Sequence, residues 1–198
     1  MIARIFCHLS AWLLAVLVCT TAARSESPDP ASLEFIHRTN ATIARAVAAS
    51  GDVRAAARKV CDELAATSLD LDAMMKTAAG RAWDKFDPVQ REAYTAAFRK
   101  RIIRDCTANA GGYLYAAVQL VGVRKLPSGD KLIGTKSEGS ADGKILMWQV
   151  HPREKGRLMV TDLLVDGRSA MLTLREEAGV AIERNDGDVA AAIAAVDR

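Results

Sequence analysis

The chain has 198 residues and a formal net charge of +3, and half of its residues are hydrophobic. A nucleic-acid-binding protein usually concentrates basic residues on one face, and a charge balance this even does not indicate that class. The length suits one domain with a sizeable core.

The N-terminus is predicted to be a cleaved signal peptide covering residues 1–23. Arg4 supplies a short positive region, residues 12–18 are mostly apolar, and Thr21-Ala22-Ala23 has the small side chains of a cleavage site. The apolar stretch is short for a membrane span, so an uncleaved anchor is the less favoured alternative. The mature chain, residues 24–198, is therefore expected to be exported as a single domain.

The first half of the mature chain is predicted to be helical. An aspartate stands before each expected helix, where N-cap residues accept a hydrogen bond from the first turn. The signal after Asp87 is the clearest, because proline follows at the first helical position and glutamine at the third completes a capping box. The expected helices begin after Asp29, Asp52, Asp70 and Asp87.

Two cysteines remain after the leader is removed, Cys61 and Cys106. In the helix after Asp87, Tyr94, Phe98, Ile102 and Cys106 recur at a spacing of four, which places Cys106 on the apolar side. Cys61 lies on the apolar face of its own helix. An exported protein meets an oxidising compartment, so a Cys61–Cys106 disulfide is predicted, with two buried free thiols as the alternative.

The periodicity changes after Gly111-Gly112, and short strands joined by turns follow. Ser169 is the expected cap of a later helix that runs to about Arg184, and Asp188 starts a short C-terminal helix. This order predicts an α+β fold, in which a four-stranded antiparallel meander packs with several helices. The strand candidates are residues 113–124, 131–137, 144–151 and 157–165.

Signals for catalysis are sparse. His37 and His151 fall in different elements without metal-ligand spacing, and no phosphate-binding loop or G-x-S-x-G motif is present. Asp162 lies in an apolar strand, where it is either a buried structural acid or a functional carboxylate, and the structural role is favoured. The chain is therefore predicted not to be an enzyme and to need no cofactor or metal.

Methionines are spread over the expected helices and strands, and methionine adapts to irregular cavities and flexible apolar ligands. Residues 145–150 carry apolar side chains on both strand faces, unlike a sheet with one wet face. Helices covering both faces explain this pattern, and so does a cavity on one face. From the residues alone, plain core is the favoured explanation.

Basic residues recur along the helix after Asp87, most densely at residues 99–104. The favoured interpretation is the solvated side of an amphipathic helix. The alternative is a basic patch, formed by Arg91, Arg99 and Arg101, that docks on an anionic membrane surface or an acidic partner.

Several short motifs occur along the mature chain in a fixed order and spacing. They are Leu69-Asp70-Leu71-Asp72 with Met74, Gly80-Arg81-Ala82-Trp83, Asp87-Pro88 with Gln90-Arg91, Ala97-Phe98, Val160-x-Asp162, Val165-Asp166-Gly167, Ser169 and Arg175. Their order and spacing resemble the MlaC family, also called the toluene-tolerance family. Three departures suggest a divergent branch: Leu158 replaces a usual tryptophan, residues 66–68 lack a proline-histidine step, and Cys106 stands at an aromatic position.

The resemblance implies a monomeric periplasmic carrier that shuttles phospholipid between an outer-membrane lipoprotein complex and an inner-membrane ABC transporter. It also implies a curled sheet and a deep apolar pocket for acyl chains. Some branches of the family accompany hopanoid synthesis, so a hopanoid-related lipid is a second candidate ligand. Two competing hypotheses are a ligand-free envelope adaptor protein and an enzyme that uses Asp162. The expected lipid-binding residues are Met75, Trp83, Phe98, Ile102, Val121, Met147, Met159, Leu163 and Met171.

Overall fold

Helices and strands are segregated along the chain, as an α+β fold requires. The computed structural model describes residues 27–114, 116–138 and 145–198, so the predicted signal peptide at 1–23 lies outside the described residues. In chain order the elements are α1 (Pro30–Ala48), α2 (Val53–Thr67), α3 (Leu71–Ala79), η1 (Gly80–Lys85), α4 (Pro88–Asn109), η2 (Ala110–Tyr113), β1 (Val118–Lys125), β2 (Lys131–Ser137), β3 (Leu146–Pro152), η3 (Glu154–Gly156), β4 (Leu158–Val165), β5 (Arg168–Ser169), α5 (Ala170–Arg184) and α6 (Ala191–Asp197).

The four predicted aspartate caps all form. The side chains of Asp29, Asp52, Asp70 and Asp87 each accept a hydrogen bond from the backbone N–H three residues further on. At α4 the Gln90 side chain also accepts the Asp87 N–H at 3.1 Å, which completes the capping box. These bonds satisfy N–H groups that have no partner inside the helix, and the predicted helix starts are confirmed.

The sheet is antiparallel and has five strands in the order β1-β2-β3-β4-β5, so the prediction of four strands is wrong. Asp166 and Gly167 adopt positive φ angles of 51° and 76°. Two successive positive φ angles make the tight turn that suits a hairpin. The turn brings Arg168 and Ser169 back onto the end of β4 as a two-residue strand. β1 also begins later than expected, because Ala110–Tyr113 form the short helix η2.

A bulge in β4 determines which side chains share a face of the sheet. Gln149 pairs with Asp162 and Val150 pairs with Val160, so Thr161 is an extra residue in β4. Leu163 and Val160 therefore lie on the same face, and Met159 lies on the opposite one. We call the face that carries Trp148 and Leu163 the inner face and its opposite the outer face.

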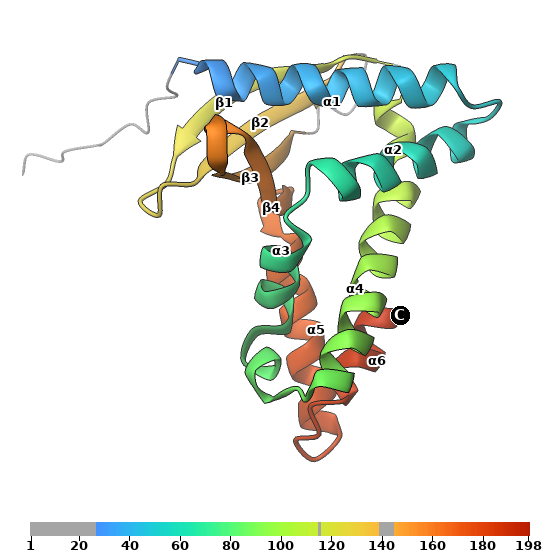
Figure 1. Cartoon of the computed structure of the whole chain (residues 1–198), viewed down its shortest axis with the longest axis vertical. Helices are drawn as coiled ribbons and strands as arrows, with labels where there is room; N and C mark the ends of the chain where they lie inside the picture. The colour runs from blue at the N-terminus through green and yellow to red at the C-terminus, as the bar shows by residue number, and fades with distance from the viewer. Residues whose placement is uncertain (1–26, 115, 139–144) are drawn as a thin grey trace, which may run out of the picture.

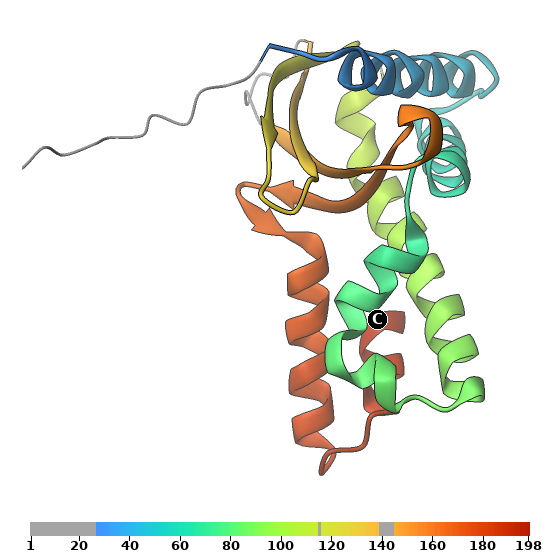
Figure 2. The same ribbon diagram turned by 60° about the vertical axis from the view of Figure 1, so that its left-hand side comes forward.

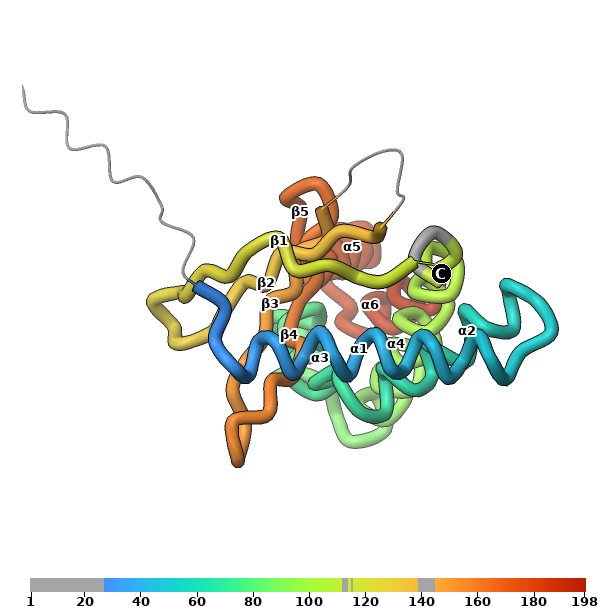
Figure 3. Tube along the Cα trace, turned by 90° about the horizontal axis from the view of Figure 1, so that it is seen from above, coloured from blue at the N-terminus to red at the C-terminus, as the bar shows by residue number. Residues whose placement is uncertain are grey.

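α1 packs against the inner face of the sheet. The Phe35 ring meets the Trp148 ring edge-on, with 5.6 Å between centroids. Asn40 holds the edge strand β1, because its amide accepts the Val118 N–H at 2.8 Å and donates to the Val118 carbonyl at 3.0 Å. Figure 2 shows the strands curling beneath α1, and Figure 3 shows α1 running alongside β1.

The helices α3, α5 and α6 form a layer that extends away from the sheet, and α4 runs the length of the molecule beside this layer and up to α2 (Figure 1). The predicted disulfide between Cys61 of α2 and Cys106 of α4 is present, with the two Cα atoms 5.9 Å apart. It fixes the C-terminal half of α4 to the part of the molecule that contains the sheet.

The linker between α2 and α3 also joins the two parts. The Asp70 N–H donates to the Val160 carbonyl and the Val160 N–H donates to the Ser68 carbonyl, both at 2.8 Å. One hydrophobic cluster continues through the junction, from Phe35 of α1 and Val160 of β4 to the buried residues of α3, α4, α5 and α6. The helical layer and the sheet therefore share a core.

Candidate functional site

Part of the inner face carries apolar side chains that are only half-buried. Leu120 and Leu146 lie in one cross-strand row on either side of Thr135, and Leu163 lies diagonally from Leu146 on β4. All three leucines pack against the main core while keeping part of their surface accessible. This exposed hydrocarbon is continuous with the interior, as expected of a surface that receives an apolar ligand.

α4 presents a second apolar surface, the predicted stripe of residues at a spacing of four. Its exposure changes along the helix. Tyr94 and Phe98 are 0% and 1% exposed, whereas Ile102, Cys106 and Ala110 are half-buried and pack against the core. The stripe is therefore accessible towards the sheet and closed towards the far end of the helical layer.

Aromatic rings fill the closed end of the stripe. Tyr94 packs on Phe86 with 5.3 Å between ring centroids, on Phe98 with 6.3 Å, and edge-on against Trp83 with 6.4 Å. The Arg91 guanidinium lies over the Trp83 ring, 5.4 Å from its centroid. Such ring contacts stabilise a core beyond the area that they bury.

The hydroxyl of Tyr94 is the exceptional polar atom in this cluster. It is buried and has no hydrogen-bond partner among the described residues. Burial raises the pKa of the Tyr94 phenol well above its ordinary value, so the group is a neutral donor at physiological pH. The hydroxyl can therefore donate a hydrogen bond that no described residue accepts.

The structure brings together six of the nine predicted lipid-binding residues. Met75, Phe98 and Met171 are buried in the main hydrophobic cluster, and Trp83, Ile102 and Leu163 pack against it half-buried. Together they occupy the inner face and the interior of the helical layer.

The other three predicted lipid-binding residues lie elsewhere. Met147 is on the outer face, where its sulfur covers Gly134 at 3.1 Å from an ideal Cβ position. Val121 is 47% exposed at the bulge in β1. Met159, also on the outer face, lines a separate pocket of about 800 Å³ with Leu69, Asp70, Arg153 and Arg157 among its walls.

Another pocket, of about 550 Å³, lies between α4 and α6 and is lined mainly by small side chains such as Ala93 and Ala194. Neither of these pockets includes the half-buried leucines of the inner face. The apolar surface described above is therefore separate from both.

The three predicted docking arginines do not form one patch. Arg91 stacks on Trp83 and Arg99 is exposed, while Arg101 points about 200° around the helix from Arg99. Arg101 pairs with Asp105 and reaches Glu177 of α5 at 3.4 Å, and its side chain is 16% exposed. Burial lowers the pKa of Arg101, but its hydrogen bonds to the carboxylates of Asp105 and Glu177 outweigh this effect and raise it.

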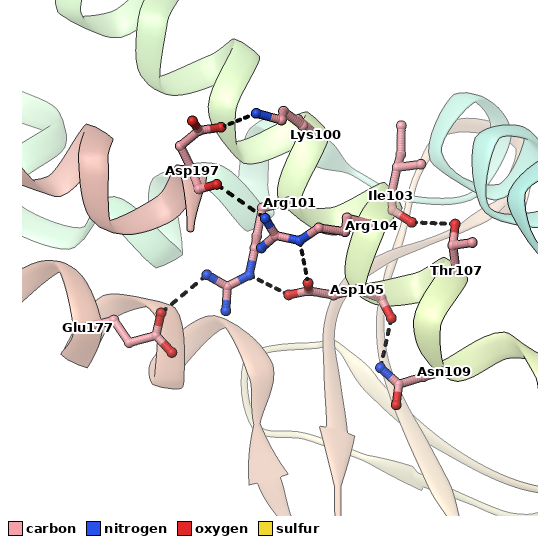
Figure 4. Close-up of polar contacts among 9 residues, drawn as sticks. All are labelled: Lys100, Arg101, Ile103, Arg104, Asp105, Thr107, Asn109, Glu177 and Asp197. Atoms are coloured by element: carbon pink, nitrogen blue, oxygen red, sulfur yellow. Dashed lines mark hydrogen bonds and ion pairs between the residues drawn. The ribbon is translucent and has the colours of Figure 1, made fainter.

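Figure 4 shows that the basic side chains in this part of α4 take part in a network of ion pairs and hydrogen bonds within the molecule. Lys100 pairs with Asp197 of α6 at 2.7 Å, and Arg104 donates to the Asp197 carbonyl at 3.2 Å. Arg101 extends from the same helix towards Glu177 of α5. The network ties α4 to both α5 and α6.

Asp162 is a buried structural acid, as its position in an apolar strand predicted. Its carboxylate accepts the Leu163 N–H at 2.7 Å, the Met171 N–H at 3.1 Å and the Ser169 hydroxyl. Ser169 in turn caps α5 by accepting the Leu172 N–H at 2.9 Å. The acid on the outer face of β4 thus fixes the start of α5, and its oxygens are engaged by protein donors.

Two parts of the site were missed from the sequence. Leu120 and Leu146 were not singled out, because their partial exposure depends on the tertiary packing around the inner face. Tyr94 was placed in the α4 stripe, but its lack of a hydrogen-bond partner depends on the packing of α3, η1 and α4. The spacing of four in the stripe was the available signal for its position.

Within the described ranges, no cluster of three or more histidine, cysteine or acidic side chains has the arrangement of a metal site. In the same ranges, no helix has the length and hydropathy needed to cross a bilayer.

Together these features define an α+β protein with a half-buried apolar surface that is continuous with its core. A family model described as MlaC protein matches residues 34–197, and the chain belongs to the MlaC family. This confirms the resemblance noted in the sequence.

A solved structure with the same fold is the phospholipid-binding protein from Ralstonia solanacearum, determined in complex with a phospholipid. The TM-score is 0.69 with 16% sequence identity, and the match covers 86% of this chain and 96% of that chain. At this identity the likeness shows the fold alone. A search of curated proteins gave no match.

Proposed function

We propose that this chain is a periplasmic lipid carrier that holds phospholipid acyl chains against the inner face of the sheet and the α4 stripe. The observation that supports this most strongly is that the half-buried side chains of Leu120, Leu146 and Leu163 pack directly against the buried core. Burying hydrocarbon there contributes about 0.8 kcal/mol for each methylene, which is ample to hold an acyl chain without covalent chemistry.

Family membership and the phospholipid in the Ralstonia solanacearum protein support phospholipid as the cargo. In this proposal the signal peptide exports the chain, which works as a monomer in the periplasm. It carries lipid between an outer-membrane lipoprotein complex and an inner-membrane ABC transporter, and so contributes to lipid asymmetry of the outer membrane. The protein catalyses no reaction on its cargo.

The test is uptake of a fluorescently labelled phospholipid from vesicles by the mature protein and two variants. Leu146→Glu places a charge among the half-buried leucines of the inner face and is expected to reduce uptake at least tenfold, because a buried charge is costly. Val89→Glu is the matched control, since Val89 is 75% exposed in the first turn of α4. Circular dichroism verifies that both variants fold.

Normal uptake by folded Leu146→Glu would contradict the assignment of the inner face. No uptake by the wild-type protein would contradict the carrier function. If labelled phospholipid is refused while a hopanoid is taken up, the carrier function stands and the cargo changes.

A further inference from the structure

The α4 stripe, together with Arg91 one turn before it, presents three kinds of side chain in order along the helix. Arg91 is exposed, Tyr94 has the unpartnered hydroxyl, and Phe98 and Ile102 offer only hydrocarbon. These residues are spaced by three or four and therefore follow one another along one face of the helix. In Figure 1, α4 starts at the far end of the helical layer and ends beside α2. Cation, phenol and hydrocarbon match the order of phosphate, ester and acyl chain in a glycerophospholipid.

Trp83 links the exposed Arg91 to the buried Tyr94. The Arg91 guanidinium lies over Trp83 at 5.4 Å, and Trp83 meets Tyr94 edge-on at 6.4 Å. Trp83 itself is only half-buried. The ring of Tyr94 therefore contacts an aromatic ring that is itself partly at the surface.

Other buried hydroxyls in the described residues show what Tyr94 lacks. Thr39 donates to the Phe35 carbonyl at 2.9 Å, and Thr135 accepts the Trp148 indole N–H at 2.8 Å. Burying a hydroxyl without a partner costs folding free energy, and phenylalanine would supply the same ring without that cost. A ligand that accepts this hydrogen bond removes the cost and gives the hydroxyl a role.

We propose that Tyr94 donates a hydrogen bond to an ester carbonyl of a bound glycerophospholipid. The phosphate of that lipid lies at Arg91, and its acyl chains follow Phe98 and Ile102 towards the inner face of the sheet. This assignment rests on the proposed carrier function and adds the orientation and the linkage of the cargo. The rings of Trp83, Phe86 and Phe98 close this end of the stripe around Tyr94, so they move apart when the lipid binds.

The test compares two phosphatidylglycerols with identical chain lengths, one with ester linkages and one with ether linkages. Each displaces a fluorescent phospholipid from delipidated mature protein. The wild type is expected to bind the diester about 3- to 10-fold more tightly, the range that one neutral hydrogen bond provides. Tyr94→Phe binds both at the diether level and is at least as heat-stable as the wild type without ligand.

Two further variants separate the parts of the proposal. Thr39→Val removes a buried hydroxyl that has a partner, so it loses thermal stability but keeps the ester preference. Arg91→Gln weakens binding of both lipids by the same factor and leaves the ester preference unchanged, because it removes only the contact with the phosphate.

The outcomes that overturn the inference are distinct from those that overturn the carrier function. If the wild type binds neither lipid, the carrier function fails and the inference fails with it. If the wild type binds both equally, or Tyr94→Phe keeps the preference or loses stability, only the role of Tyr94 is overturned. Undiminished binding by Arg91→Gln overturns the placement of the phosphate.

Discussion

Reduction of the Cys61–Cys106 disulfide is expected to lower the free energy of unfolding substantially. The bond closes a loop with a sequence separation of 45 residues. In the chain-entropy model, closing such a loop removes about 13 cal/mol/K from the unfolded chain, which corresponds to about 4 kcal/mol at 25 °C. Because the bond joins α2 to the half-buried part of the α4 stripe, its loss also frees one wall of the proposed ligand surface.

The assay is equilibrium unfolding in urea, followed by circular dichroism with and without reductant. For a slope of about 2 kcal/mol/M, a loss of about 4 kcal/mol moves the midpoint down by about 2 M. The double variant Cys61→Ala/Cys106→Ala is the control and should match the reduced protein whether or not reductant is present. A midpoint that reductant leaves unchanged, or two titratable thiols in the untreated protein, would contradict the stabilising role of the bond.

Three further predictions concern stability. Gly80→Ala should lower the free energy of unfolding by about 1–3 kcal/mol, because φ of Gly80 is +56° and the new Cβ would lie 2.7 Å from Arg175 Nε. An unchanged midpoint in a urea titration would contradict this. Burial raises the pKa of Asp29, but hydrogen bonds from Lys131 and Ser32 lower it overall from 3.8 to about 2, so its ion pair stabilises the fold above pH 4 and is lost as the pH falls towards 2. Asp29→Asn should therefore cost about 1 kcal/mol at pH 7, after allowance for solvent screening. The cost should be much smaller near pH 2, where about half of the carboxyl is protonated, and an equal cost at both pH values would argue against the ion pair. Asp162→Asn should cost about 2–4 kcal/mol in thermal or urea unfolding, since an amide cannot accept all three donors, and wild-type stability would contradict the structural role.

The helix starts and the disulfide could be predicted because their signals are local. An aspartate such as Asp87 caps the N–H groups of its own first turn, and the stripe in α4 sets which side of the helix Cys106 faces. The Asp166-Gly167 pair is also typical of a hairpin turn. A hairpin at this position pairs Arg168 and Ser169 with the end of β4, which is the fifth strand.

The ligand surface was harder to predict, because strand faces depend on register. In a regular strand Met159 and Leu163 would share a face, and both were expected to bind lipid. The extra residue Thr161 reverses this, so that Leu163 faces inwards and Met159 faces the outer pocket. No local pattern in β4 fixes the position of such a bulge.

Whether the basic residues of α4 are free or paired could not be predicted either, because their partners are distant in the sequence. Arg101 has the same local sequence pattern as an exposed helix arginine, yet its partner Glu177 lies 76 residues away. Only the packing of α5 near α4 shows that Arg101 belongs to an internal network, while Arg99 remains exposed.

The most decisive test of the carrier function is native mass spectrometry of the mature protein purified from the periplasm, with lipid extraction in parallel. We expect a protein mass increased by about one bound lipid, and an extract in which a glycerophospholipid is the main component. A mass equal to the bare polypeptide, in a preparation that also takes up no phospholipid from vesicles, would contradict the carrier function.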